Sequence, residues 1–120
     1  MSKRDIFPAL HLDTVFTATL LKEIHRHVEN YRNTGNWLRT DVGVFKDYLI
    51  DNESYYLIYE HPMHIYLNRG YQSTKLDLQQ FIDKRIELSG DIGLDIWVLP
   101  VNKNWLISCN HDDDIFASRK

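Results

Sequence analysis

Cysteine and glycine are scarce in this chain, which has one cysteine and five glycines among 120 residues. A lone cysteine, Cys109, cannot form a disulfide within the chain, and a free thiol suits a reducing compartment. Five glycines leave little material for a glycine-rich phosphate loop. The sequence also lacks the Gly-x-Ser-x-Gly and His-Glu-x-x-His motifs, so it excludes the common signatures of serine hydrolases and zinc proteases.

The chain also lacks a long hydrophobic run. Its first apolar segment, residues 14–21, ends at Lys22, which makes it too short to span a bilayer and unlike a secretory signal. Together with the single cysteine, this predicts a cytoplasmic protein that does not enter a membrane. Hydrophobic residues make up 43% and charged residues 26% of the chain, a balance that predicts one globular domain over residues 1–120.

Basic clusters are missing as well. The formal net charge is −3, and residues 41–68 concentrate the negative charge, with Lys46 as their only lysine or arginine before Arg69. The carboxylates of that segment are Asp41, Asp47, Asp51, Glu53 and Glu60. Nucleic-acid binding needs clustered lysine and arginine to neutralise phosphates. The sequence therefore predicts no nucleic-acid partner and favours a basic protein partner.

Two segments have apolar residues at the three- or four-residue spacing of a helix. Asp13 can cap the first, which is expected to end near residues 33–35, and Thr74 with Asp77 has capping-box spacing at the start of the second. Gly90 lies just past its expected end. The predicted buried faces are Phe16, Leu20, Ile24, Val28 and Tyr31 in the first helix and Leu78, Phe81, Ile82 and Ile86 in the second.

Alternating and β-branched runs predict the strands. Residues 55–60 and 64–69 form an expected hairpin, and residues 92–99, 105–110 and 115–118 an expected meander. In the first strand of the meander, Asp95 and Trp97 share one face, and Ile92, Leu94, Ile96 and Val98 share the other. In the next strand, Trp105, Ile107 and Cys109 share one face. The predicted fold is α+β, with an antiparallel sheet of about five strands, one hairpin plus a C-terminal meander, packed with two or three helices.

The segment 36–51 is ambiguous. Thr40 could cap a short helix that buries Val42, Phe45 and Leu49. Val42 and Val44, with a glycine between them, would also suit an extended strand. The helix is the favoured alternative.

Tyrosines and carboxylates in one region suggest a contact surface. On the expected strand 55–60, Tyr55, Leu57 and Tyr59 lie on one face and Tyr56, Ile58 and Glu60 on the other. If one face is exposed, it offers the aromatic and acidic composition that suits a basic partner; alternatively, helices cover both faces. The candidate partner-binding residues are Asp47, Asp51, Glu53, Tyr56, Tyr59 and Glu60.

Metal and catalytic sites have weaker support. Glu60, His61 and His64 could bind zinc only if a further ligand such as His111 joined them from another strand. The acidic turn at residues 110–114 resembles the start of a calcium loop, but the glycine that such a loop requires at its sixth position is replaced by Ile115. We therefore predict no metal, no cofactor and no catalytic residue, with an enzyme or metal-dependent domain as the alternative.

The segment from Asn104 to Ile115, with the sequence Asn-Trp-Leu-Ile-Ser-Cys-Asn-His-Asp-Asp-Asp-Ile, resembles the closing strand-turn-strand of small bacterial immunity proteins. These proteins neutralise toxins of contact-dependent inhibition and other interbacterial systems. The resemblance implies a non-catalytic, cytoplasmic toxin inhibitor whose partner is a cognate toxin domain, such as a nuclease. A structural subunit that oligomerises through a strand edge is a further alternative.

Overall fold

The computed structural model describes residues 10–50, 53–61, 63–85, 95–112 and 114–119. Within these ranges seven strands form one antiparallel sheet in the order β1-β4-β3-β5-β6-β7-β2. The strands are β1 (Leu10–His11), β2 (Trp37–Thr40), β3 (Ser54–Glu60), β4 (Arg69–Thr74), β5 (Asp95–Pro100), β6 (Ile107–Cys109) and β7 (Ile115–Ser118). The helices are α1 (Thr14–Asn33), α2 (Val44–Tyr48) and α3 (Lys75–Arg85). The predicted α+β class is confirmed.

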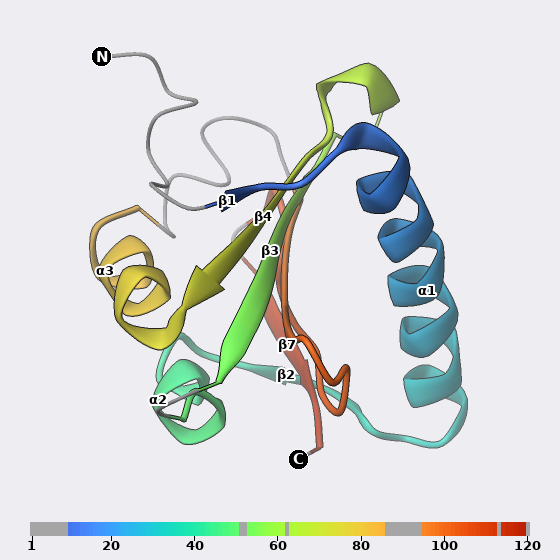
Figure 1. Ribbon diagram of the computed structural model, residues 1–120. Coiled ribbons are helices and arrows are strands. Elements are labelled where there is room, and N and C mark those ends of the chain that lie inside the picture. The colour runs from blue at the N-terminus through green and yellow to red at the C-terminus, as the bar shows by residue number, and fades with distance from the viewer. Residues whose placement is uncertain (1–9, 51–52, 62, 86–94, 113, 120) are drawn as a thin grey trace.

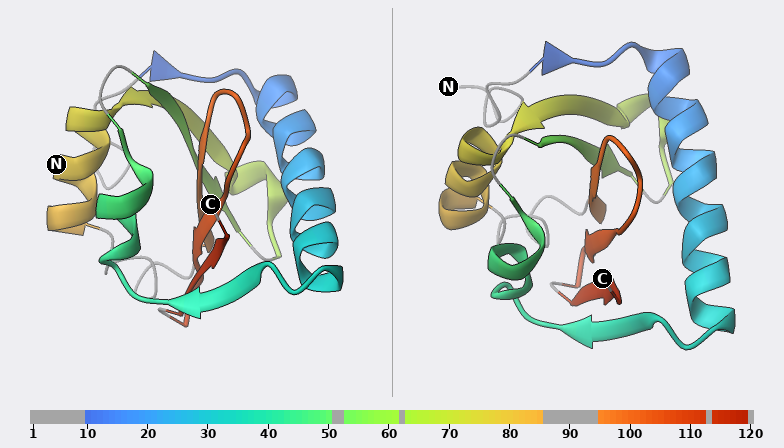
Figure 2. Two further views of the ribbon diagram at one scale, coloured as in Figure 1. Left: turned by 90° about the horizontal axis from the view of Figure 1, so that it is seen from below. Right: turned by 60° about the horizontal axis from the view of Figure 1, so that its bottom comes forward.

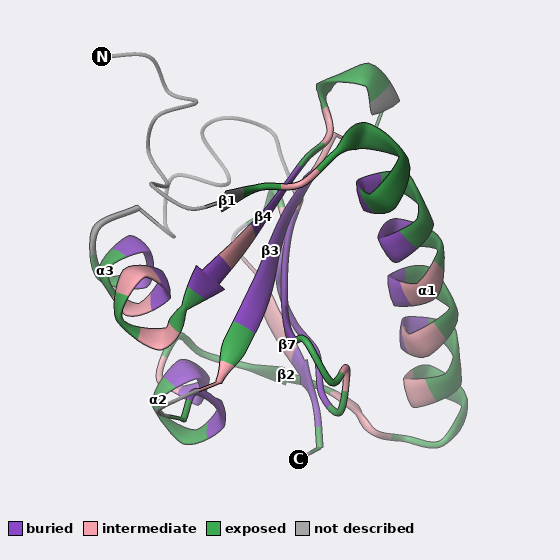
Figure 3. Cartoon of the chain, viewed as in Figure 1, coloured by how far each residue is buried: buried purple, intermediate pink, exposed green. Residues whose placement is uncertain are grey.

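The sheet lies between two helical layers, with α1 on one side and α2 and α3 on the other (Figures 1 and 2). Five consecutive residues of β3, Tyr55 to Tyr59, are buried. Side chains alternate between the faces of a strand, so continuous burial means that both faces are covered, as the central strands in Figure 3 show. None of the helices in the described ranges has the length and apolar character needed to cross a membrane.

The protein has two hydrophobic cores, and helix α1 packs against the sheet in one of them. The Asp13 carboxylate accepts a hydrogen bond from the backbone N–H of Phe16 at 2.7 Å, which satisfies an otherwise unpaired donor of the first turn. The helix ends at Asn33, so both its predicted cap and its predicted end are confirmed. Of its predicted buried face, Phe16 is wrong, because it is 37% exposed in the first turn, and Tyr31 is only partly buried. The apolar residues of this core are Leu20, Leu21, Ile24 and Val28 from α1 and Tyr56, Ile58, Trp97, Leu99 and Leu106 from the sheet.

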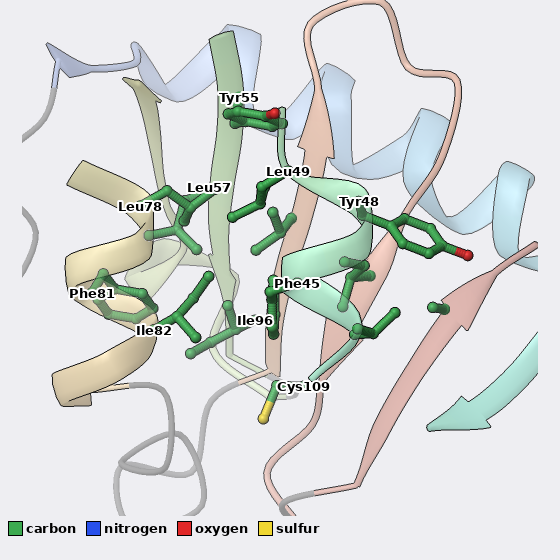
Figure 4. Packing of buried hydrophobic residues seen from close by; sticks show 14 of the residues in the cluster. Phe45, Tyr48, Leu49, Tyr55, Leu57, Leu78, Phe81, Ile82, Ile96 and Cys109 are labelled. Atoms are coloured by element: carbon green, nitrogen blue, oxygen red, sulfur yellow. The ribbon is translucent and has the colours of Figure 1, made fainter. Parts of the chain in front are cut away.

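Helices α2 and α3 cover the second core (Figure 4). The capping interaction predicted for α3 is present, because the N–H of Asp77 donates to the Thr74 hydroxyl at 3.3 Å. Leu78, Phe81 and Ile82 are buried as predicted, whereas Ile86 and Gly90 lie outside the described residues. The predicted face of Trp105, Ile107 and Cys109 is confirmed, and all three belong to this core.

Two predicted segments differ from the structure. Within the described part of 36–51, Trp37–Thr40 forms strand β2 and Val44–Tyr48 the short helix α2, and Val42 is exposed between them rather than buried. The strand predicted at residues 64–69 is wrong, because Ile65–Leu67 is a 3-10 helix and β4 begins only at Arg69. In both places, pairing decides the outcome, since β2 forms against β7 and β4 begins where Arg69 meets Tyr59.

Candidate functional site

The tyrosines predicted at the partner surface are both buried. Tyr56 is 8% exposed and belongs to the α1 core, whereas Tyr59 is 7% exposed and belongs to the core of α2 and α3. Burial raises the pKa of the Tyr59 hydroxyl above its usual value. The two rings lie on opposite sides of the sheet, so they cannot contribute to one contact surface. The alternative in which helices cover both faces is the one the structure shows.

The carboxylates of the same prediction lie in different places. Asp47 is exposed on α2, and Asp51 lies outside the described residues. Glu53 is half-buried and accepts hydrogen bonds from the Tyr55 hydroxyl at 3.2 Å and the Asn102 amide at 3.0 Å. Glu60 faces α1 instead. The six residues therefore do not form one continuous patch.

Of the candidate metal ligands, His61 and His64 lie side by side, with 4.8 Å between their ring centroids, but they gain no third ligand among the described residues. The Nδ1 atom of His61 accepts hydrogen bonds from the backbone N–H groups of Met63 and His64, at 3.1 and 2.9 Å. This atom therefore closes the turn after β3. His111 bonds to Asp95. Across the described ranges, no group of three or more histidine, cysteine, aspartate and glutamate side chains could hold a metal ion.

Sequence patterns did not reveal a cleft of about 650 Å³ between α1 and the sheet. Its helical wall comes from the second half of α1 and includes Glu29 and Arg32. Its other wall comes from strands β5, β6, β7 and β2, close to the 110–114 turn. These strands carry residues that are distant in sequence but adjacent in the sheet, because Trp97 pairs with Ser108 and Ser108 pairs with Phe116.

Aromatic rings form part of the sheet wall of this cleft. Trp37 lies nearly parallel to Phe116, with 6.1 Å between ring centroids and 12° between planes, and stacks on Trp97 at 6.4 Å and 28°. Behind Trp37, the ring of Tyr31 lies 6.1 Å away at 7°. We call Trp37, Trp97 and Phe116 the aromatic wall. Trp37 and Phe116 line the cleft and are partly exposed, whereas Trp97 is 7% exposed.

Two carboxylates lie opposite each other in the sheet, and one of them, Asp95, lines the cleft. Glu60 and Asp95 are register partners on β3 and β5, an arrangement in which like charges destabilise a sheet. Each has a histidine partner from another element. His25 on α1 donates from Nε2 to the two oxygens of Glu60, at 3.1 and 2.8 Å, and the Trp97 indole donates to the same carboxylate at 2.9 Å.

His111 supplies the partner of Asp95. Its backbone N–H and its Nδ1 both bond to Asp95 Oδ1, at 3.0 and 2.9 Å. Since a carboxylate only accepts, Nδ1 must carry the proton. This hydrogen bond, with the nearby charges of Asp112 and Asp95, raises the pKa of His111 above its ordinary value. The pair holds the 110–114 turn against the start of β5.

We expect the Asp95→Asn substitution to lower the pKa of His111 towards its ordinary value of 6.5. A raised folded-state pKa stabilises the fold below the unfolded-state pKa, and this contribution is lost as the pH rises through the folded-state value. The wild-type advantage over Asp95→Asn should therefore shrink as the pH rises above that value. NMR titration of the imidazole and urea unfolding at several pH values would measure both effects, with the remote Asp47→Asn variant as control. An unchanged His111 titration in Asp95→Asn would contradict this assignment.

Comparison with known proteins does not assign this cleft a function: no family model, no curated protein and no solved structure matches the chain. The sequence held one signal for the site, which was the placement of Asp95 and Trp97 on the same strand face. That placement is confirmed. The contributions of Trp37 and Phe116 depend on the strand order, which the sequence pattern did not predict.

Proposed function

We propose that this chain is a non-catalytic protein-binding module whose contact surface centres on the cleft beside α1. We further propose that its partner is a basic bacterial toxin domain, such as a nuclease, which it neutralises in the cytoplasm as an immunity protein. The observation that carries the binding proposal is the pair of partly exposed rings, Trp37 and Phe116, that line a cleft of about 650 Å³. The toxin class rests on the resemblance of residues 104–115.

The composition of the cleft supports a protein contact. Binding energy at protein interfaces concentrates in a few tryptophan, tyrosine and arginine residues set in pockets and surrounded by polar groups. Trp37, which is partly exposed, provides such an anchor, and Glu29 and Arg32 lie on the helical wall. Because stacked rings hold each other in position, little side-chain freedom would be lost when a partner binds.

The surface continues along α1 towards its N-terminal end. There, a second cavity of about 440 Å³ lies between α1 and the connection from β3 to β4, and its lining includes Leu21 and Tyr66. His25 lines both cavities. Met63 and Tyr66 on that connection are 81% and 71% exposed. Exposed apolar side chains beside a cavity are typical of interaction sites, so the proposed interface extends over both cavities.

Charge supports a basic partner. The chain carries a net charge of −3, and a nuclease must bind a negatively charged substrate in a basic cleft. Opposite charges would steer the two proteins together and raise their association rate, mainly at low ionic strength.

Growth rescue tests the function directly. The reading frame immediately upstream of this gene would be expressed from an inducible promoter, with and without this chain. We expect growth arrest that the chain relieves, together with a one-to-one complex of the purified proteins. An upstream product that does not arrest growth, or arrest that the chain leaves unchanged, would contradict the proposal.

A matched pair of variants locates the interface. Trp37→Ala together with Phe116→Ala should raise Kd for the toxin roughly 30-fold or more, the usual effect of removing interface anchors. Leu76→Ala removes an exposed apolar side chain from α3 on the other side of the sheet and should leave Kd unchanged. If circular dichroism shows that both variants are folded and both change Kd equally, the interface does not lie at the cleft.

A further inference from the structure

We propose that the cleft binds an arginine side chain of the partner, stacked on the aromatic wall and paired with the carboxylates of Glu29 and Asp95. This inference rests on the proposed function and names the chemical group that the cleft recognises. It makes the cleft a cation site rather than a general apolar pocket.

The charges around the cleft favour a cation. Glu29 and Asp95 line it. The histidines of the lining bring further carboxylates, since His25 bonds to Glu60 and the Nε2 atom of His111 lies 3.7 Å from Asp112. The permanently charged cation of the lining is Arg32. With both histidines neutral, the lining itself holds two carboxylates and one arginine and so carries a net charge of −1; a protonated His25 would be paired with Glu60, and a protonated His111 with Asp95 and Asp112.

The aromatic wall favours a guanidinium over an ammonium group. A cation above the face of an indole is attracted by the negative charge of the ring face, and the planar guanidinium also stacks on the ring. Trp37 and Phe116 stack on each other, with 12° between their planes, so a guanidinium that enters the cleft could extend this stack parallel to the rings. The volume of about 650 Å³ lies within the usual range of binding pockets, and it leaves room for atoms on either side of the arginine.

Asp95 retains acceptor capacity for this role. Both of its hydrogen bonds from His111 go to Oδ1, and no described residue donates to its other oxygen, Oδ2. The two oxygens of a carboxylate provide about four acceptor positions. An arginine could therefore bond to Oδ2 without displacing His111. Glu29 is exposed one helical turn before Arg32, so its carboxylate can reach the cleft mouth from the helical wall.

Two substitutions on the same face of α1 test whether the group that binds in the cleft is positively charged. Glu29→Gln should weaken binding of an arginine peptide roughly threefold to tenfold, and Arg32→Gln should strengthen it by a similar factor, because each removes one exposed charge beside the bound cation. Arg26→Gln removes a charge from the same helix outside the cleft lining and should change Kd less than twofold. Salt should reduce both expected effects.

The probe is the peptide acetyl-Gly-Arg-Gly-amide, titrated into the full chain and followed by the indole N–H resonances in NMR spectra. We expect shifts at Trp37 and Trp97. The indole of Trp105 is an internal control, because this residue lies in the core on the other side of the sheet. Matched peptides with lysine, norleucine or glutamate in place of arginine should bind more weakly, in that order.

Equal binding of the arginine and norleucine peptides, or a preference for the glutamate peptide, would overturn the arginine assignment. The outcome is separable from that of the growth assay. If the toxin is neutralised through Trp37 but its binding does not change in Glu29→Gln or Arg32→Gln, the proposed function stands and this inference is wrong. Arginine-selective binding without neutralisation of the upstream product would remove the toxin assignment and leave the cation site.

Discussion

Replacing Trp105 with alanine is expected to lower the free energy of unfolding by about 3–5 kcal/mol, the usual effect of truncating a large buried aromatic side chain. Trp105 is 5% exposed. Its ring contacts Tyr48 edge-on, with 5.2 Å between centroids, and Tyr55 at 5.7 Å. Because α2 and β3 meet at this ring, its loss would leave a cavity between a helix and the sheet. Urea unfolding followed by circular dichroism measures the change.

A loss of this size matters because small domains are stable by only about 5–15 kcal/mol in total. If Trp105→Ala does not fold, Trp105→Phe provides a milder variant that keeps an aromatic ring in the core. Leu76→Ala on the exposed side of α3 is the control and should change stability by less than about 0.5 kcal/mol. A change below about 1 kcal/mol in Trp105→Ala would contradict the central position that we assign to this ring.

The thiol of Cys109 reports on the same core. Its side chain is buried with Trp105 and Ile107 on one face of the sheet. A bulky thiol reagent should therefore label the native protein much more slowly than the unfolded chain, because labelling requires the core to open. Labelling should become faster in Trp105→Ala. Native-state labelling at the rate of a free peptide thiol would instead place this face in solvent.

Substituting Gly70 with alanine is expected to destabilise the protein by about 1–3 kcal/mol, the usual range for an added methyl group in a packed core. A Cβ at this position would lie 2.6 Å from the Thr17 hydroxyl, 3.1 Å from Ile58 and 3.2 Å from Leu12. The first contact is too short, and Thr17 is itself buried and donates to the backbone carbonyl of Asp13 at 2.9 Å. The close approach of α1 to β4 therefore requires glycine.

A double-mutant cycle checks this cause. Removing the hydroxyl in Thr17→Ala relieves the shortest contact, so Gly70→Ala should destabilise that background less than it destabilises the wild type. Urea unfolding of the four proteins gives the coupling energy. Additive effects of the two substitutions would show that Thr17 is not the obstacle.

The helices are the part of the structure that local sequence determined best. Asp13 and Thr74 act as predicted at the starts of α1 and α3, and the apolar spacing identified Leu20, Ile24 and Val28 as buried. Helix periodicity and capping depend on residues within one or two turns, so they can be recognised without knowledge of the fold. Alternation likewise predicted correctly which residues of β3 and β5 share a face, because it depends only on the period of an extended chain.

Only the tertiary structure determined which strands and helices are neighbours. The four residues of β2 become a strand because β7, far away in the sequence, pairs with them, and this pairing brings Trp37 beside Phe116. Alternation separated Tyr56 from Tyr59 but could not show that α1 covers one face and α2 and α3 the other. The local sequence pattern specifies which residues share a face of a strand. Contacts between residues distant in the chain determine which helix packs on each face and where a cleft remains.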